Sequence, residues 1–305
     1  MIGRITLKRA LKRTAGLAAV ADASIRRRGA APHACILVYH RIADVSFVDP
    51  ACDDWNVDPR TFERQVAALA ECATIVPLSD VLRLLAERRN ETRPLACLTF
   101  DDGYANFASA ALPVLVRYGA PATVFVVTDA MDREGPMPFD AWSRAHAADQ
   151  PPEAWRPLRW EELDRCVATG LVAVGAHSHT HRNGLGATRE ELDEEASRAR
   201  SLLVARYGAA AGEAYSYPYG SRRLGQVTDA YVGAVRRAGF RTGVTTDLGV
   251  ALPGDDPLAL PRVEAHGLDT GAVITAKARG ALGPYRLTDR LRRARRAGAS
   301  TEGGH

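Results

Sequence analysis

The chain reads Leu98-Thr99-Phe100-Asp101-Asp102-Gly103 at the end of an apolar run, and about 75 residues later it reads Gly175-Ala176-His177-Ser178-His179-Thr180-His181 at the end of a second run. Both runs have the length and composition of buried β-strands. In α/β proteins the sites lie at the C-terminal ends of such strands. Two carboxylates and two imidazoles are therefore expected together at one edge of a sheet.

These four side chains are the minimum set for metal-assisted hydrolysis. Two imidazoles and one carboxylate can hold a divalent cation and leave a position for water, and a second carboxylate can take a proton from that water. Each motif alone has an ordinary alternative, because Asp-Asp-Gly suits a turn and His-x-x-x-His can be a surface pair. The two motifs together, each after a strand, favour a site. His179 is offset by two residues, so we expect its side chain to point elsewhere.

Strand and helix patterns alternate along most of the chain, which at 305 residues is long enough for one large domain. Apolar runs predict strands at 35–39, 74–77, 95–100, 122–127, 171–176, 214–217 and 241–245, with another before Pro261. This alternation indicates an α/β fold with a parallel sheet and right-handed crossovers. Seven or eight such units favour closure of the sheet into a barrel.

Five segments, in this order, resemble motifs of the polysaccharide deacetylases, the fourth carbohydrate esterase family. They are Leu37-Val38-Tyr39-His40-Arg41, Thr99 to Gly103, Tyr118 to Val126, His177-Ser178 with His181, and Tyr217-Pro218-Tyr219-Gly220. The first is similar to the start of a subgroup that acts on poly-N-acetylglucosamine and related exopolysaccharides. The resemblance implies a distorted (β/α)7 barrel of parallel strands in a single domain, which we place at 33–270 between basic extensions at 1–32 and 271–305.

The resemblance also implies a role for each polar side chain. Adjacent aspartates cannot both face one metal from an extended chain, and the family order makes Asp101 the base and Asp102 a ligand. His177 and His181 complete the ligand set. The third motif implies that the amide N–H of Tyr219 donates to the oxyanion that forms during hydrolysis.

Two assignments depart from the usual family pattern. The general acid usually comes from a Leu-x-His motif near the end of the domain, whereas in the subgroup it lies at the start, which makes His40 the candidate and His266 its competitor. The family often has an arginine two residues before the proline of the third motif. Here that position is Ser216, and Arg262 is the candidate that supplies the charge instead.

The ligand types indicate which metal to expect. Zn²⁺ suits two imidazoles and one carboxylate, and these ligands leave Co²⁺, Ni²⁺, Mn²⁺ and Fe²⁺ open. The cysteines are scattered and include no Cys-x-x-Cys pair, so a thiolate zinc site is not expected. Their odd number, five, fits a reduced compartment.

One stretch interrupts the alternation, from Asp129 to Pro157, and it contains Trp142, His146 and Trp155. It follows a strand C-terminus, so we expect it to overhang the face that carries the site. It is either a substrate-binding flap whose rings stack on sugar faces or an ordinary insertion with a small core of its own.

Basic residues are concentrated at both ends of the chain. The first 28 residues carry eight basic side chains against one acid, Asp22, and six arginines lie between 286 and 296. A basic amphipathic segment can lie on an anionic membrane surface, and a solvated tail is the alternative. Because no aromatic residues lie among the basic ones, no nucleic-acid partner is expected. No apolar run is long enough to span a membrane, so we expect a cytoplasmic protein or one peripheral to the cytoplasmic membrane face, with export left open.

The sequence thus predicts a metal-dependent hydrolase that removes N-acetyl groups from an amino-sugar glycan, either a polysaccharide or a lipid-linked saccharide, and releases acetate. One alternative keeps the site and changes the substrate to another non-peptide C–N bond. A second alternative is a non-catalytic, glycan-binding protein of the membrane surface with a decayed site. The intact aspartate pair and histidine pair argue against decay.

Overall fold

The computed structural model describes residues 2–25, 32–45, 55–87 and 93–283. Within these ranges the strands are β1 (Ala34–Tyr39), β2 (Arg41–Ile42), β3 (Asn56–Val57), β4 (Thr74–Ile75), β5 (Leu95–Phe100), β6 (Ala122–Val126), β7 (Val172–Ala176), β8 (Ala214–Ser216), β9 (Thr242–Leu248) and β10 (Leu260–Glu264). The α-helices are α1 (Ile2–Ile25), α2 (Pro59–Cys72), α3 (Val81–Glu87), α4 (Leu112–Tyr118), α5 (Ala141–His146), α6 (Pro152–Trp155), α7 (Trp160–Val167), α8 (Arg189–Tyr207), α9 (Asp229–Ala238) and α10 (Gly271–Ala278). Shorter helical turns are η2 (Leu78–Asp80), η3 (Phe107–Ala111) and η4 (Ala209–Gly212).

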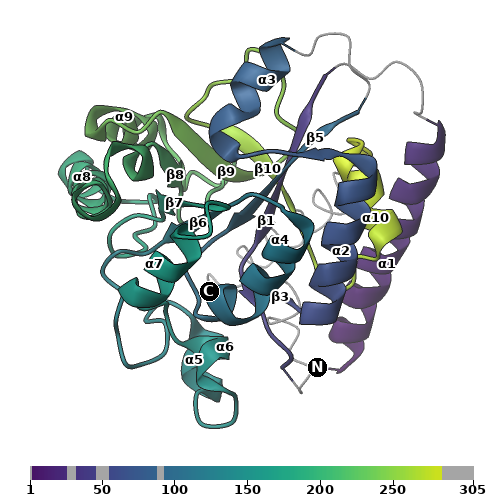
Figure 1. The fold of residues 1–305 in the computed structure, drawn as a ribbon, viewed down its shortest axis with the longest axis horizontal. Coiled ribbons are helices and arrows are strands. Elements are labelled where there is room, and N and C mark those ends of the chain that lie inside the picture. Colours follow the sequence, from purple (N-terminus) through teal and green to yellow (C-terminus); the bar gives the residue numbers. More distant parts are fainter. Residues whose placement is uncertain (1, 26–31, 46–54, 88–92, 284–305) are drawn as a thin grey trace, which may run out of the picture.

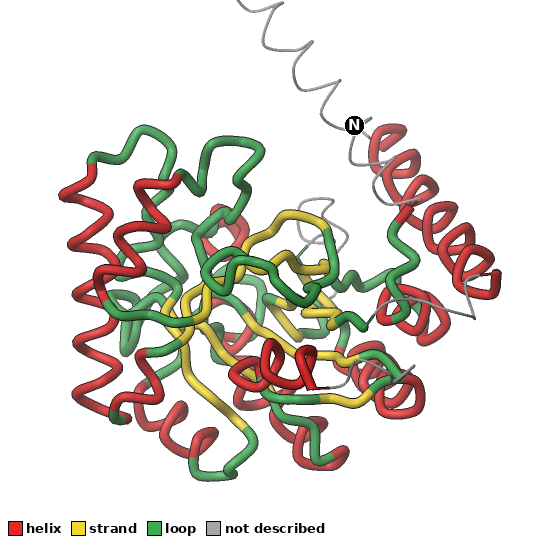
Figure 2. The backbone as a smooth tube through the Cα atoms, turned by 90° about the horizontal axis from the view of Figure 1, so that it is seen from above, coloured by secondary structure: helices red, strands yellow, loops and turns green. Residues whose placement is uncertain are grey.

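Parallel strands close into a barrel in the order β1-β10-β9-β8-β7-β6-β5, because β5 pairs back onto β1 (Figure 1). The closing register runs from Ala34 opposite Leu95 to Tyr39 opposite Phe100. Figure 2 shows the strands gathered in the middle of the molecule with helices around them. The short β4 pairs with the start of β5 on the outside of the ring. The predicted distorted (β/α)7 barrel is therefore confirmed.

The strands read as continuous apolar runs because both of their faces are buried. Leu37 and Leu98 join a cluster with Phe62 and Val66 of α2, the layer between barrel and helices. The neighbouring residues Ile36 and Cys97 belong to a second cluster, which contains Phe125, Val244 and Leu260 from other strands. Since side chains alternate along a strand, the second cluster is the barrel interior.

Toward the C-terminal edge of the barrel the interior becomes polar. Thr99 lies two residues beyond Cys97, and Arg262 lies two residues beyond Leu260. Ser216 stands in the same relation to Ala214. All three polar side chains are almost fully buried. Because every second side chain of a strand points to the same face, these polar groups point into the barrel just beyond its apolar interior.

Local signals mark where the elements begin and end. Thr188 and Glu191 form a capping box at the start of α8, and Gly239, with a φ of 99°, caps the end of α9. The last strand was expected before Pro261, whereas β10 (Leu260–Glu264) contains that proline. The register of β10 on β9 shifts between Leu260 and Arg262, and such an irregularity accommodates a proline that has no N–H to donate.

Both ends of the described chain carry helices. α1 covers most of the expected extension at 1–32. It packs on α10 (Figure 1), where Ala19 clusters with Ala276 and with Ala281, which follows the helix. α10 begins at the first residue assigned to the C-terminal tail, and its Ile274 is fully buried in the main core. The basic groups at 26–28 and 286–296 lie outside the described residues. Among the helices that the structure describes, none is long and apolar enough to cross a membrane.

The 129–157 insertion has a small core of its own. Trp142 and Ala154 pack with Ala43 in one cluster, and Met137 packs with Tyr104 in another. Trp142 is only 6% exposed, so its ring is not offered to a sugar. For this side chain the structure favours the second of the two alternatives.

Candidate active site

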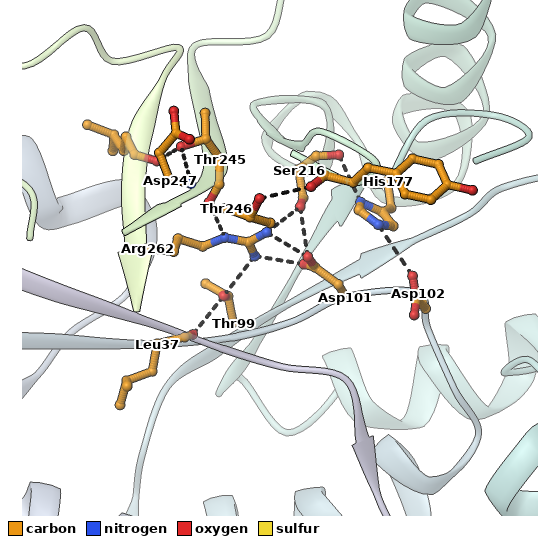
Figure 3. Close-up of polar contacts among 12 residues, drawn as sticks. Leu37, Thr99, Asp101, Asp102, His177, Ser216, Thr245, Thr246, Asp247 and Arg262 are labelled. Atoms are coloured by element: carbon orange, nitrogen blue, oxygen red, sulfur yellow. Dashed lines mark hydrogen bonds and ion pairs between the residues drawn. The ribbon is translucent and has the colours of Figure 1, made fainter. Parts of the chain in front are cut away.

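The C-terminal parts of β5, β7, β8 and β10 bring their polar side chains together at one edge of the barrel (Figure 3). Asp101 and Asp102 follow β5, and His177 and His181 follow β7. Arg262 lies within β10, which is separated from β5 by β1 in the ring of strands. Asp101 and Arg262, 161 positions apart in the sequence, are thereby brought into direct contact.

Asp101 and Arg262 form a buried, two-pronged ion pair. Arg262 donates Nη1–H to Oδ1 at 2.8 Å and Nη2–H to Oδ2 at 2.6 Å, and the two side chains are 0% and 2% exposed. Burial alone would raise the pKa of Asp101. The charge of Arg262 and its hydrogen bonds, together with the charge of His177, outweigh burial and hold the pKa of Asp101 below its usual value. Asp101 is therefore kept ionised.

Further hydrogen bonds hold the guanidinium in place. Arg262 donates Nε–H to the carbonyl of Thr245 at 2.9 Å and contacts the hydroxyl of Thr99 at 3.2 Å. The Ser216 hydroxyl accepts from Arg262 at 3.0 Å and donates to Asp101 at 3.1 Å. Every nitrogen of Arg262 has a partner, as a buried charge requires. Arg262 therefore places a positive charge beside Asp101, as expected from the sequence, where the family often has an arginine at the position of Ser216.

Asp102, His177 and His181 converge on one point. The Nε2 atoms of His177 and His181 lie 3.3 and 3.5 Å from Asp102 Oδ1, and the candidate ligand atoms all lie within 4.8 Å of one another. Burial would raise the pKa of Asp102, but hydrogen bonds from both imidazoles hold it well below its usual range. His177 donates Nδ1–H to the carbonyl of Ser216 at 2.8 Å, so Nε2 is the nitrogen that it directs toward Asp102. This donor set fits a divalent metal.

The loops that carry these side chains are strained. Among the described residues, five non-glycine residues have a positive φ, and four of them lie here: Asp102 (72°), Ser178 (61°), His181 (65°) and Tyr219 (61°). Such conformations are costly and persist only where the surroundings impose them. The left-handed backbone at Asp102 turns its side chain away from that of Asp101. One carboxylate therefore meets the imidazoles and the other meets Arg262.

The two candidate general acids lie in different places. Burial lowers the pKa of His40, while the charges of Asp102 and Asp101 act in the opposite direction, so its ring lies within electrostatic reach of the site. The ring of His266 instead lies 3.3 Å from Glu264 and accepts from Lys12 of α1 at 3.2 Å. The carbonyl of Tyr39 accepts from the Asp101 N–H at 2.9 Å, so His40 follows β1 beside the aspartate pair, whereas His266 contacts the N-terminal helix.

Tyr219 lies in a tight turn beside His181. Its carbonyl accepts from the Thr246 hydroxyl at 2.8 Å, its side chain is 47% exposed, and its ring centroid is 4.9 Å from that of His181. Gly220 has a φ of 67°, and a Cβ there would meet the Thr246 nitrogen at 2.8 Å. The glycine is thus required by the close approach of β9 to the turn.

The family model for polysaccharide deacetylases matches residues 88–243, which is half of the chain. The chain belongs to the polysaccharide deacetylase family. This deacetylase is accordingly an enzyme of a class that removes N-acetyl groups, and the family assignment made from the five motifs is confirmed. The match covers both aspartates, both histidines and the turn at Tyr219, whereas His40 and Arg262 lie outside it.

Relatives of this deacetylase extend the comparison. The poly-beta-1,6-N-acetyl-D-glucosamine N-deacetylase of Staphylococcus aureus (strain MRSA252) is 21% identical over 248 residues, which are 75% of this chain and 78% of that protein. Among solved structures, the Streptococcus pyogenes deacetylase PplD in complex with acetate has a TM-score of 0.65 at 21% identity, over 82% of this chain and 99% of that one. IcaB from Ammonifex degensii has a TM-score of 0.64 at 24% identity, over 81% and 97%. These structures share the fold.

Sequence reasoning missed two aromatic side chains at the site. Phe139 of the insertion stacks on His181 with ring centroids 3.8 Å apart, and Trp55 contacts the ring of His40 at 4.7 Å. Trp55 is 48% exposed. Neither residue lies in a motif or follows a barrel strand, so no local pattern distinguishes it. His179, expected to point elsewhere, pairs its Nδ1 with the Thr128 hydroxyl at 2.9 Å.

Proposed function

We propose that this enzyme removes N-acetyl groups from a polymer of N-acetylglucosamine, with Asp102, His177 and His181 as the metal ligands and Asp101 as the base. The observation that carries the proposal is the division of the adjacent aspartates. Asp102 faces two imidazoles at 3.3 and 3.5 Å, while Asp101 is held ionised by Arg262 at 2.6 Å. One site thus offers a cation-binding set beside a separate, charged proton acceptor.

The proposed metal is Zn²⁺, which the two imidazoles and one carboxylate suit best. When bound, such an ion polarises the acetamide carbonyl and makes the attacking water more acidic. The chain's own residues then move the protons. Asp101 takes the proton of the water, and its fixed geometry on Arg262 keeps the carboxylate aimed at one place.

Two further groups complete the proposed reaction. The amide N–H of Tyr219 donates to the acetamide oxygen as that oxygen gains negative charge, a role supported by the resemblance of its turn to the third family motif. His40 protonates the leaving amine. Burial lowers the pKa of His40, and a lower pKa makes the protonated imidazole a stronger acid toward the amine.

The proposed substrate follows from the relatives and from two exposed rings. The related Staphylococcus aureus enzyme is named for poly-β-1,6-N-acetylglucosamine. In this chain Trp55 and Tyr219 are each about half exposed, beside His40 and His181 respectively. Sugars offer apolar faces to aromatic rings of this kind. We therefore propose that the two rings contact the glycan on either side of the scissile acetamide.

The proposal is tested by acetate release together with metal content. Purified enzyme is incubated with oligomers of β-1,6-linked and β-1,4-linked N-acetylglucosamine and with a cyclic amide, and acetate and free amine are quantified. We expect equal amounts of both products from the β-1,6 oligomers. His177→Ala and His181→Ala should lose the metal and the activity together. Hydrolysis of the cyclic amide alone would favour the other C–N bond, and full metal occupancy in either variant would exclude the ligand assignment.

A second proposal concerns α1, which we place on an anionic membrane surface. The helix carries five basic residues before its single acid, Asp22. Lys12 faces the domain through His266, whereas Arg13 is exposed and Leu17 is 72% exposed. An outward apolar side chain next to a basic one suits the interface of an anionic bilayer.

A further inference from the structure

The imidazole of His181 is held differently from that of His177. His177 has its Nδ1–H fixed by the Ser216 carbonyl at 2.8 Å. The Nδ1 of His181 is buried and has no hydrogen-bond partner among the described residues, while its Nε2 lies 3.5 Å from Asp102. Histidine ligands almost always fix their second nitrogen by a hydrogen bond. Another contact must therefore set the orientation of this ring.

A phenyl ring from the 129–157 insertion supplies that contact. Phe139 and His181 stack with centroids 3.8 Å apart and planes at 14°. Tyr219 makes a looser contact, at 4.9 Å and 58°. An aromatic face lying parallel to an imidazole at this separation prevents the imidazole from turning about its Cβ–Cγ bond, because either edge would collide with the phenyl ring.

The phenyl ring is itself supported from behind. Phe139 packs against a buried cluster of Tyr104, Val127, Ala130 and Met137. Met137 is 0% exposed and Tyr104 is 4% exposed. Phe139 is thus enclosed between this cluster and His181, which leaves it little room to move away from the imidazole.

A buried ion pair determines where the insertion lies. The carboxylate of Asp140, next to Phe139, accepts from Arg41 Nη2 and from the Tyr104 hydroxyl, each at 2.6 Å. Arg41 is 2% exposed, and its guanidinium lies 3.9 Å from the centroid of the Trp142 ring. Arg41 belongs to β2, and Tyr104 lies in the loop after β5. The insertion is therefore tied to β2 and to the loop after β5.

We infer that Phe139 is a positioning residue for the metal ligand His181, and that the Arg41–Asp140 ion pair sets the place of its ring. The inference rests on the proposed metal site. Stacking does for His181 what the Ser216 carbonyl does for His177: it fixes the direction of the Nε2 lone pair. Removal of the phenyl ring lets the imidazole turn, and the metal is then held less tightly.

Metal affinity, measured independently of turnover, tests the inference. Metal-free enzyme competes for Zn²⁺ with a chromophoric chelator, and Co²⁺-loaded enzyme is examined by visible absorption, which reports the ligand geometry. Phe139→Leu should weaken Zn²⁺ binding roughly 10- to 100-fold and change the Co²⁺ bands. Phe139→Tyr, which keeps the ring, should restore both. Met137→Ala is the matched control, since it opens the supporting cluster but leaves the phenyl ring on His181. It should lower thermal stability and weaken Zn²⁺ binding much less than Phe139→Leu does.

Two results would overturn the inference. One is a wild-type Zn²⁺ affinity and Co²⁺ spectrum in Phe139→Leu. The other is an equal loss of affinity in Met137→Ala, because it would show that any loosening of the insertion has the same effect. Full Zn²⁺ occupancy in His181→Ala would instead refute the proposed metal site. If His181→Ala loses the metal and Phe139→Leu does not, only the present inference fails.

A double-mutant comparison tests the part assigned to the ion pair. Asp140→Asn removes the charge that faces Arg41, and it should weaken Zn²⁺ binding in the wild-type background. In the Phe139→Leu background it should cause no further loss, because the ion pair acts through the phenyl ring. If Asp140→Asn weakened Zn²⁺ binding by the same factor in both backgrounds, the ion pair would not act through the phenyl ring.

Discussion

The replacement of Arg262 by methionine separates the charge of the arginine from its bulk. Arg262 is fully buried against Asp101, so Arg262→Met leaves a buried carboxylate without its partner. Breaking a buried pair in this way costs about 3–5 kcal/mol, out of roughly 5–15 kcal/mol for a typical domain. At about 2–4 °C per kcal/mol, the midpoint of thermal unfolding should fall by roughly 6–20 °C.

The same substitution should change the pH dependence of turnover. Asp101 must be ionised to act as a base, so activity is present above its pKa and is lost as the pH falls through it. Arg262 opposes the effect of burial and lowers this pKa. Without the arginine the pKa of Asp101 rises, and the acidic limb of kcat/KM should move to higher pH.

Two variants serve as controls, with acetate release followed across pH and unfolding followed by circular dichroism. Ser216→Ala removes a hydrogen bond from a neutral hydroxyl to the Asp101 carboxylate, worth about 1.5–3 kcal/mol for a charged acceptor, and should move the acidic limb much less than Arg262→Met does. Asp101→Asn combined with Arg262→Met removes both charges and should recover most of the stability but none of the activity. If Arg262→Met unfolded at the wild-type temperature with an unmoved acidic limb, the assigned role of the ion pair would be refuted.

Three further predictions concern the base, the acid and the N-terminal helix. Asp101→Asn should keep the metal, measured by elemental analysis, while acetate release falls about 10²–10⁴-fold; loss of the metal would reverse the roles of the aspartates. His40→Ala should lower turnover most for substrates with a basic leaving amine and least for an activated aryl ester. If His266→Ala showed this pattern and His40→Ala did not, His266 would be the general acid. Arg13→Glu with Leu17→Ser should reduce sedimentation with anionic vesicles at low salt, and equal sedimentation of this variant and the wild type would exclude α1 as the contact.

Much of the barrel could be predicted from short-range patterns. β5 was expected at 95–100 and runs over Leu95–Phe100, because a strand buried on both faces shows as an unbroken apolar run between polar ends. β7 begins one residue later than expected. The C-terminal ends of parallel strands share one edge. The meeting of the aspartate pair with the histidine pair was therefore predictable once the alternation of strands and helices was recognised.

The partners of those side chains depend on contacts between distant parts of the chain. Arg262 was named only as a candidate, and its hydrogen bonds to Asp101 depend on the closure of β10 onto β1. For the 129–157 insertion the sequence allowed two interpretations, a substrate-binding flap and a segment with a small core of its own. Its position depends on the pairing of Arg41 with Asp140, 99 residues apart, and no sequence pattern within the insertion specifies that pair.

The sequence by itself determined the family, the seven-stranded barrel and the set of polar residues at its edge, because strand burial, capping and the end of an apolar run are encoded within a few neighbouring residues. The family resemblance implied that Asp102 is the ligand and Asp101 the base, and only the tertiary structure gives the physical reason: the left-handed backbone at Asp102 aims the two side chains apart. It also decided that Phe139 lies on His181. A side chain's direction follows from its own backbone angles, but what it meets there depends on how distant strands and loops pack together.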